Sequence, residues 1–405
     1  MASGRITEWR KLPIGLTELC LATTLRCGQS FRWKQCSDDT WACSLRGRIV
    51  QLSQQSTHVN YRSIWPNQTE TPPTPPSSAP PETDEAGDDT LELLQHYLNL
   101  RPNLTELYEQ WSASDPNFKK KAPKFTGVRI LRQDAWEALV CFICSSNNNI
   151  SRIMQMVDKL CLHYGPYIAT LDGRPYHDFP QASALTGDKV EAHLRELGFG
   201  YRGRFIVATA RAVDEHEEDW IDTLRNPESP SFGHKASPGG EWNAEGRDGY
   251  RAAHEELLKL LGVGAKVADC VCLMGLGWGE AVPIDTHVWQ IAVRDYKFGK
   301  GKHSSLTKAT YDSVANHFRK LWGQEAGWAH SVLFTADLRV FSERLTAKIE
   351  MKEESGHIKV EEVETTAKTS IKRENEDEAP KPVLELDEMA VSSNTSERVK
   401  RRRRR

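Results

Sequence analysis

The spacing of hydrophobic residues divides the chain into a region of short strands followed by a long helical region. Residues 5–65 alternate apolar and polar positions and are rich in β-formers, most clearly at residues 31–33, 41–45 and 48–52. This alternation predicts a small antiparallel sheet. From residue 91 onward, apolar residues recur every three or four positions, as in amphipathic helices. The pattern therefore predicts an α+β fold, in which an N-terminal antiparallel β-sheet domain precedes a mainly α-helical core.

The same spacing places the individual helices of the core. Apart from residues 255–293, we expect helices at residues 91–98, 104–111, 135–144, 153–163, 305–321 and 327–347.

Changes in composition set the domain boundaries. Residues 66–90 are rich in Pro, Ser, Thr and acids, and residues 226–249 are rich in Pro and Gly. Such segments have too few apolar residues to form a core, so we expect both to be disordered inserts. We assign residues 1–134 to the sheet domain, residues 135–347 to the helical core, and residues 348–405 to a disordered charged tail with a basic end.

Composition points to a soluble globular protein. The 405 residues are 39% hydrophobic and include 12 Trp and 12 Phe, enough for a large core. We find neither a run of about 20 apolar residues, as a membrane span requires, nor an apolar signal sequence at the start. Nine cysteines, an odd number mostly scattered singly, indicate reduced thiols, and their spacing predicts no metal site.

The net charge of −3 is unevenly distributed. Six acids and no base fall within residues 66–90, and without that insert the remaining chain carries +3. A local basic face is therefore compatible with binding nucleic acid. The chain ends with Arg398, Lys400 and five further arginines, a cluster typical of nuclear localisation or of non-specific nucleic-acid contact. We expect a nuclear protein and leave a mitochondrial location open.

The most informative stretch is residues 255–293. A helical apolar stripe breaks at Gly262-Val263-Gly264, and a second helix follows, so the pattern predicts a helix hairpin. The glycines let the backbone approach a ligand closely, and the start of the second helix carries partial positive charge, which suits a phosphate. Lys266 lies in the first turn of that helix, and Asp285 is placed to cap another one. An amine and a carboxylate would then face one cleft.

Three other short motifs offer candidate ligand contacts. Gly28 precedes a predicted strand, where its backbone can approach a ligand. Three consecutive asparagines, beginning at Asn147 and followed by Arg152, exceed what one helix cap needs and offer groups that read base edges. The segment around Tyr201 and Arg202 combines glycines, an aromatic ring and cations, as a wedge and a phosphate clamp would require.

These motifs together resemble those of a known family. In chain order they are CGQSFRW, SSNNNI, LGxGYR, LGVGAKVADCxCLM, PIDTHVW, RDY and GWAHSVLFTADLR. They are similar to the motifs of the eukaryotic 8-oxoguanine DNA glycosylase/AP lyases, within the helix-hairpin-helix DNA glycosylase superfamily. The resemblance covers roughly residues 5–345 apart from the two inserts.

The resemblance implies a catalytic pair and a base pocket. Lys266 would attack the sugar C1′, and Asp285 would stabilise the positive charge that develops on the sugar. The Gly28 carbonyl would accept the N7 hydrogen that 8-oxoguanine has and guanine lacks. The remaining residues expected to contact the flipped base are Cys270, Met274, His330 and Phe334.

The resemblance also implies how the DNA is held. Asn147, Arg152 and Arg202 would contact the orphaned cytosine while Tyr201 fills the gap in the stack. The other expected DNA contacts are Gly262, Gly264 and His287. The implied protein is a monomeric, bifunctional repair enzyme without a cofactor that acts on double-stranded DNA containing 8-oxoguanine opposite cytosine.

Two positions depart from the family pattern. Leu261 replaces a proline in the hairpin turn, and because that proline mainly pre-sets the turn we expect little loss. His330 replaces a glutamine that faces the Watson–Crick edge of the base, so we expect altered geometry or pH dependence there.

Three alternatives stay open at this point. The chain could be a superfamily glycosylase for another damaged base, a non-catalytic helix-hairpin-helix DNA-binding module, or a monofunctional glycosylase that uses water as its nucleophile. The pairing of Lys266 with Asp285 disfavours the second alternative, and the lysine disfavours the third.

Overall fold

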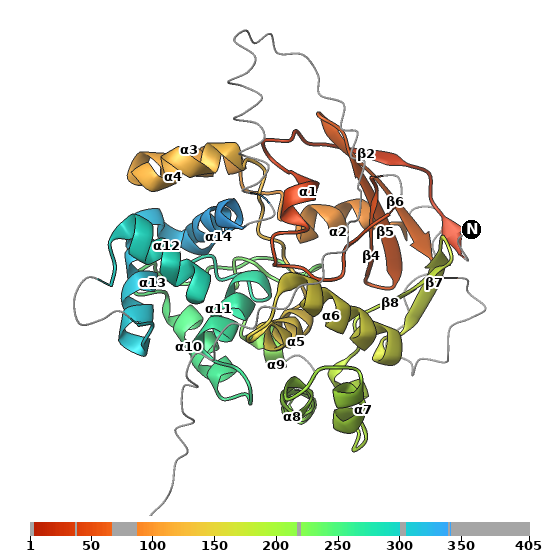
Figure 1. Ribbon diagram of the computed structural model, residues 1–405. Coiled ribbons are helices and arrows are strands. Elements are labelled where there is room, and N and C mark those ends of the chain that lie inside the picture. The colour runs from red at the N-terminus through yellow and green to blue at the C-terminus, as the bar shows by residue number, and fades with distance from the viewer. Residues whose placement is uncertain are drawn as a thin grey trace, which may run out of the picture. The chain divides into compact units, whose positions relative to one another are not determined.

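The computed structural model describes residues 4–36, 39–66, 87–216, 220–299, 305–338 and 341. These described residues all belong to one compact unit. Within it, an antiparallel sheet lies beside a group of helices (Figure 1). Residues 67–86 of the first predicted insert and the predicted tail from residue 348 lie outside the described residues. No helix within the described part of the chain is long and apolar enough to cross a bilayer.

The main sheet is antiparallel, as predicted. Its strands run in the order β1-β6-β5-β4-β3, with β2 also paired to β6. The turn between β4 and β5 consists of Arg46 and Gly47, with φ of 47° and 76°. Positive φ at both positions gives the primed turn that matches the twist of a hairpin. The strand bounds are β1 Arg5–Ile6, β2 Arg10–Pro13, β3 Lys34–Gln35, β4 Trp41–Leu45, β5 Arg48–Gln54 and β6 His58–Trp65.

The predicted strand at residues 31–33 is wrong, because these residues precede β3 as irregular backbone. Their alternation has another cause. The Phe31 ring packs edge-on against Phe142 of the helical core at 5.8 Å, whereas Trp33 is buried in the core under the sheet. Arg32 lies between the two cores, and its guanidinium donates to Glu137 at 2.7 Å.

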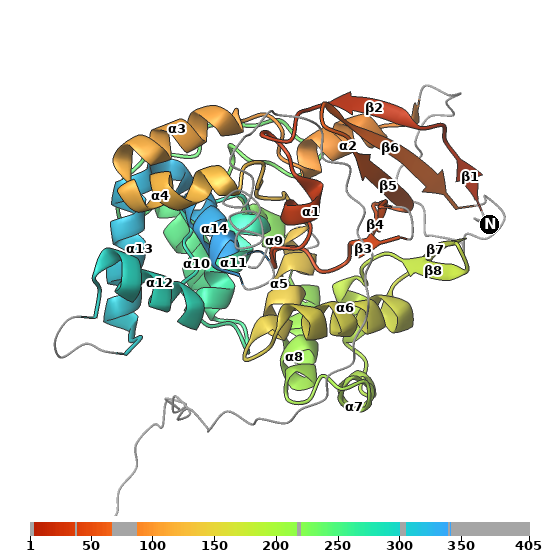
Figure 2. The same ribbon diagram turned by 45° about the horizontal axis from the view of Figure 1, so that its top comes forward.

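Both faces of the sheet are covered. One face packs on α1 (Leu21–Thr24) and α2 (Thr90–Tyr97). The other packs on a two-stranded hairpin, β7 (Tyr167–Leu171) and β8 (Arg174–His177), which follows α6 (Ile150–Tyr164) in the chain (Figure 2). This hairpin lies inside a region that the hydrophobic pattern predicts to be helical.

Side-chain caps start many of the helices. Asn103, Asp115, Asp134, Asn149 and Thr307 each accept a backbone N–H at a helix start, which satisfies a donor that the helix itself leaves unpaired. The helix bounds are α3 Leu104–Ser114, α4 Pro116–Lys121, α5 Ala135–Ser145, α6 Ile150–Tyr164, α7 Val190–Glu196, α8 Arg202–Asp214, α9 Trp220–Thr223, α10 Asp248–Leu258, α11 Ala265–Met274, α12 Thr286–Tyr296, α13 Lys308–Trp322 and α14 Ala326–Asp337.

The second insert differs from the expected disorder. Residues 226–249 are irregular until α10 begins at Asp248, but they are described throughout. Arg247 anchors them: its guanidinium donates to Glu280 at 2.8 Å and to Glu228 at 2.7 Å. Glu280 is fully buried, and a buried carboxylate needs such a partner. The composition of the insert gives no sign of this ion pair between Arg247 and Glu280, because the two residues are distant in the chain.

Candidate active site

The helix hairpin predicted from the sequence is formed by α10 and α11. Gly262 in its turn has φ of +86°, and a Cβ there would lie 2.6 Å from the Phe205 ring. Only glycine fits at this position. Gly264 caps α11 and has open space around it, so the first N–H groups of α11 stay accessible to an anion. Leu261, at the position of the family proline, is exposed and strains nothing.

Lys266 is oriented by Ser145, which is not among the predicted site residues. Its Nζ donates to the Ser145 hydroxyl at 3.1 Å. The Ser145 hydroxyl in turn donates to the Phe142 carbonyl at 2.7 Å, so its lone pair is directed toward the amine. The Nζ also lies 5.1 Å from the centre of the Phe142 ring. Ser145, at the end of α5, therefore fixes the orientation of the Lys266 amine on α11.

Asp285 caps α12, as predicted. Its Oδ1 accepts the Val288 N–H at 2.8 Å. The cap fixes the carboxylate at the helix start and leaves its other oxygen available for a ligand.

The two helix starts open on one small cavity of about 50 Å³. All seven residues predicted for catalysis and base binding line it, although they come from four separate parts of the chain. These residues are Gly28, Lys266, Cys270, Met274, Asp285, His330 and Phe334.

Gly28 has a backbone conformation that other residues rarely adopt. Its φ is +84°, and a Cβ there would lie 3.0 Å from Ile150. The neighbouring Gln29 holds the loop, because its side chain donates to the Arg129 carbonyl at 2.7 Å and its own carbonyl accepts from Gln133. No hydrogen bond between described residues ends on the Gly28 carbonyl, so this oxygen remains available to a ligand.

The two thiols of the cavity are not ionised at neutral pH. Burial raises the pKa of both Cys27 and Cys270 to about 11, although Lys266 acts in the opposite direction on Cys270. A neutral thiol is a weak nucleophile and behaves as a small apolar side chain. The two cysteines are therefore poor candidates for a nucleophile in this cavity.

His330 is the unusual polar residue of the cavity. It is 6% exposed, and neither ring nitrogen has a hydrogen-bond partner among the residues that the structure describes. The nearby Gly327 carbonyl already accepts from Ser331 at 2.8 Å. Burial lowers the pKa of His330 to about 4, although Asp285 acts in the opposite direction. The imidazole is therefore neutral at physiological pH, with one donor and one acceptor unused.

Phe334, which lines the cavity, contacts a second aromatic ring. The Phe334 ring packs edge-on against His287 at 5.3 Å. The Nε2 of His287 lies 3.1 Å from the Asp337 carboxylate, without hydrogen-bond alignment.

A second group of predicted residues gathers at the turn between α5 and α6. Two of the three asparagines serve the helices: Asn148 donates to the Cys144 carbonyl at the end of α5, and Asn149 caps α6. Asn147 is exposed, with φ of 46°, and its side chain makes no hydrogen bond to the described residues. The expectation that the asparagines exceed the capping need is therefore confirmed for Asn147 alone.

Three predicted DNA contacts surround this turn. Tyr201 is 49% exposed, and its hydroxyl donates to the Ser146 carbonyl at 3.3 Å. Arg202 is 4% exposed and donates to the carbonyls of Ser146 and Asn147. Arg152 is exposed at the start of α6. Arg152 also donates to the Gly198 carbonyl at 3.4 Å. Arg202 is thus buried against the turn, whereas Tyr201 and Arg152 are exposed.

The chain is similar to known proteins along most of its length. Residues 11–139 match the family model of the 8-oxoguanine DNA glycosylase N-terminal domain. The N-glycosylase/DNA lyase of Saccharomyces cerevisiae is 36% identical over 393 residues, covering 91% of this chain and 97% of the yeast protein. The chain belongs to the 8-oxoguanine DNA glycosylase family.

A plant relative supports the same family, and a solved structure shares the fold. The N-glycosylase/DNA lyase OGG1 of Arabidopsis thaliana is 33% identical over 336 residues, covering 82% of this chain and 80% of the plant protein. A solved 8-oxoguanine glycosylase/lyase of Clostridium acetobutylicum, in complex with DNA containing cytosine opposite the lesion, has a TM-score of 0.59 at 24% identity. The match covers 78% of this chain and 91% of the Clostridium protein. At this level of identity the likeness shows a shared fold. As a family member, this chain is a DNA glycosylase and lyase.

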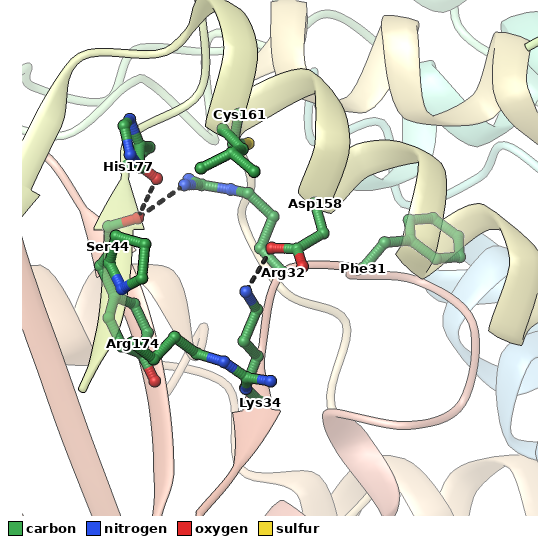
Figure 3. Close-up of a pocket in the computed structure, with 11 residues that line it drawn as sticks. Phe31, Arg32, Lys34, Ser44, Asp158, Cys161, Arg174 and His177 are labelled. Carbon is green, nitrogen blue, oxygen red and sulfur yellow. Dashed lines mark hydrogen bonds and ion pairs between the residues drawn. The ribbon is translucent and has the colours of Figure 1, made fainter. Parts of the chain in front are cut away.

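A second, larger cavity lies away from this family site. It has a volume of about 180 Å³ and is lined by residues of β3, β4, α6 and β8 (Figure 3). Its polar groups largely pair with one another: Lys34 with Asp158, and Arg32 with Ser44, whose hydroxyl donates to the His177 carbonyl.

Proposed function

We propose that this chain excises 8-oxoguanine paired with cytosine from double-stranded DNA and then cleaves the strand at the resulting site. The observation that carries the proposal is the shared cavity: the amine of Lys266 and the carboxylate of Asp285 open on the same space as the Gly28 loop. A base inside a duplex cannot reach such a cavity, so the nucleotide must first be flipped out of the stack.

The chemistry follows from these two side chains. As the unprotonated amine of Lys266 bonds to C1′ of the sugar, the bond from C1′ to the base breaks, and Asp285 stabilises the positive charge that develops on the sugar. The base leaves with the bonding electron pair and takes up a proton. The bonded nitrogen loses one proton, and its remaining lone pair forms a C=N bond to C1′ as the bond from C1′ to O4′ breaks. O4′ takes up a proton, and the product is a protonated Schiff base. Loss of a proton from C2′ then expels the 3′ phosphate by β-elimination.

Lesion recognition follows from the free carbonyl of Gly28. In 8-oxoguanine N7 carries a hydrogen, which this oxygen can accept. Guanine has a lone pair at N7, which the same oxygen repels. A site with an unpaired buried acceptor discriminates strongly against a ligand that lacks the donor. We assign the walls of the base pocket to Cys270, Met274 and Phe334, and the contact to the base edge to His330.

The remaining assignments concern the DNA around the flipped nucleotide. We assign Tyr201 to the gap in the stack, Asn147 and Arg152 to the orphaned cytosine, and Arg202 both to that base and to the support of the turn. Phosphates would be bound by the backbone at Gly262 and Gly264 and by His287. We further propose that the protein acts as a monomer in the nucleus. The basic cluster at residues 398–405, which supports the nuclear location, lies outside the described residues.

The alternatives explain less of the site. A module that only grips phosphates needs neither Lys266 nor Asp285. A glycosylase for an alkylated base would gain nothing from the free carbonyl at Gly28, since alkylation adds no N–H at that edge.

The test is excision by the full chain under single-turnover conditions on matched duplexes. The duplexes would carry 8-oxoguanine opposite cytosine, 8-oxoguanine opposite adenine, undamaged guanine or 3-methyladenine. We expect the first to be cleaved fastest, by at least roughly 10-fold over any other. Faster release of the alkylated base would overturn the lesion assignment, and binding without release from any duplex would favour the binding module.

A further inference from the structure

Lys266 and Asp285 stand at the starts of two different helices, so their separation depends on what joins those starts. Lys266 lies in the first turn of α11, whereas Asp285 follows the irregular segment 281–284. An error of about 1 Å in such a pair is enough to reduce the rate roughly 100-fold. The connection between α11 and this segment therefore matters for catalysis.

Two buried hydrogen bonds make that connection through Tyr311 of α13. The Tyr311 hydroxyl donates to Oδ2 of Asp269 at 2.5 Å, and it accepts the Ile284 backbone N–H at 3.2 Å. Asp269 lies on α11, three residues after Lys266, and Ile284 directly precedes Asp285. A continuous path of hydrogen bonds thus runs from the helix of the amine to the residue before the carboxylate.

The direction of these bonds follows from the groups involved. A backbone N–H can only donate, so the Tyr311 oxygen accepts from Ile284 and its own hydrogen is free for Asp269. Burial raises the pKa of Tyr311 well above its ordinary value, so the hydroxyl keeps this hydrogen. Both Tyr311 and Asp269 are buried, at 8% and 1% exposure, so water does not compete for these bonds.

We propose that Tyr311 is a positioning residue for Asp285, which ties the carboxylate to the helix that carries Lys266. The proposal rests on the catalytic role assigned to Asp285 above. Neither the helix hairpin nor the cap of α12 can do this, since each fixes only one of the two groups. Without the Tyr311 hydroxyl, the Ile284 N–H would be buried with no partner, and the segment before Asp285 would shift to satisfy it.

The chain contains a matched control. Tyr250 of α10 donates to the other oxygen of Asp269, also at 2.5 Å, and it is 6% exposed. Its hydroxyl makes no hydrogen bond to the segment before Asp285. Tyr311→Phe and Tyr250→Phe therefore remove the same atom, the same bond to Asp269 and a similar amount of buried polarity. Only the first variant disconnects Ile284.

The experiment compares single-turnover excision of 8-oxoguanine, affinity for a duplex carrying an uncleavable abasic analogue, and thermal unfolding in the full chain. We expect Tyr311→Phe to lower the excision rate roughly 10- to 100-fold, with affinity changed less than about threefold. Tyr250→Phe should unfold at a similarly reduced temperature but keep its excision rate within about threefold of wild type. Equal rate losses in the two variants would overturn the proposal, because they would show a general structural role.

A second pair of variants separates this proposal from the assignment of Asp285 itself. If Tyr311 acts through the carboxylate, Tyr311→Phe should slow Asp285→Asn by less than about twofold, because the group that it positions is already gone. An undiminished effect of Tyr311→Phe in that background would overturn the positioning role while leaving Asp285 catalytic. Wild-type excision by Asp285→Asn alone would instead overturn the catalytic assignment and, with it, this proposal.

Discussion

Replacing His330 by glutamine should make the protein less sensitive to acid. The His330 pKa of about 4 lies below the value of 6.5 for a free histidine. The unfolded chain therefore takes up a proton at a higher pH than the folded chain does. The lowered pKa of His330 therefore makes stability depend on pH. The stability that depends on a neutral His330 is intact above about pH 6.5, is lost progressively between pH 6.5 and 4, and is fully lost below pH 4.

The size of the effect follows from the two pKa values. The full difference between the folded and unfolded pKa corresponds to about 3 kcal/mol in the free energy of unfolding. About 1.3 kcal/mol of this is lost between pH 7.5 and pH 5.5. Glutamine does not titrate, so the His330→Gln variant lacks this loss. Burial also lowers the pKa of His96 to about 4, but His96 is present in both proteins and its effect cancels in the comparison.

The assay is urea unfolding of wild type and His330→Gln at pH 7.5 and pH 5.5. Wild type should lose roughly 1 kcal/mol more than the variant over this interval. Equal losses in the two proteins would refute a neutral, buried His330. Over pH 6–8 the ratio of their excision rates should stay constant, because the ring remains neutral there. A ratio that changes with a midpoint near pH 6.5 would show that the ring titrates in the working range.

Three further predictions concern other residues of the site. Asp285→Asn keeps a good helix cap, so excision should slow roughly 100-fold or more while DNA affinity changes less than about threefold; equal losses of rate and affinity would indicate a structural cap only. Gly28→Ala should destabilise the protein by roughly 1–2 kcal/mol in thermal unfolding, because of its positive φ and its contact with Ile150; an unchanged unfolding temperature would contradict that strain. Tyr201→Ala should reduce duplex affinity roughly 10-fold while changing stability by less than about 0.5 kcal/mol, and unchanged affinity would exclude the wedge.

The parts of the site that could be predicted from the sequence are those formed by neighbouring residues. The glycine turn of the hairpin and the cap at Asp285 depend on a few consecutive positions, so their patterns are readable. The surplus of asparagines at residues 147–149 was readable for the same reason, although sequence could not tell which of them is free.

The parts that could not be predicted depend on pairs distant in the chain. Ser145 orients an amine 121 positions away, and Tyr311 contacts Asp269 across 42 positions. Neither residue has a local pattern that distinguishes it from an ordinary helix residue. A distant pair also explains the wrong strand prediction at residues 31–33. Arg32 is a polar residue between two aromatic ones because it forms an ion pair with Glu137, 105 positions away, and this local pattern resembles that of a strand. Local periodicity reports burial, and burial here has several causes.

The resemblance to a family supplied what local patterns could not, namely which distant motifs meet. The seven residues expected around the base come from motifs separated by up to about 300 positions, and all of them line one cavity. Their individual roles remain predictions that the variants above test.

The most direct test of the account is to trap the covalent intermediate. The full chain would be incubated with borohydride and a duplex carrying 8-oxoguanine opposite cytosine, with an undamaged duplex as the control substrate. Lys266→Gln would be compared with Lys259→Gln, which removes the same charge from an exposed position of the same hairpin. We predict an adduct on the lesion duplex with wild type and Lys259→Gln, and none with Lys266→Gln. An adduct that persists in Lys266→Gln, or base release by wild type without any adduct, would contradict Lys266 as the nucleophile.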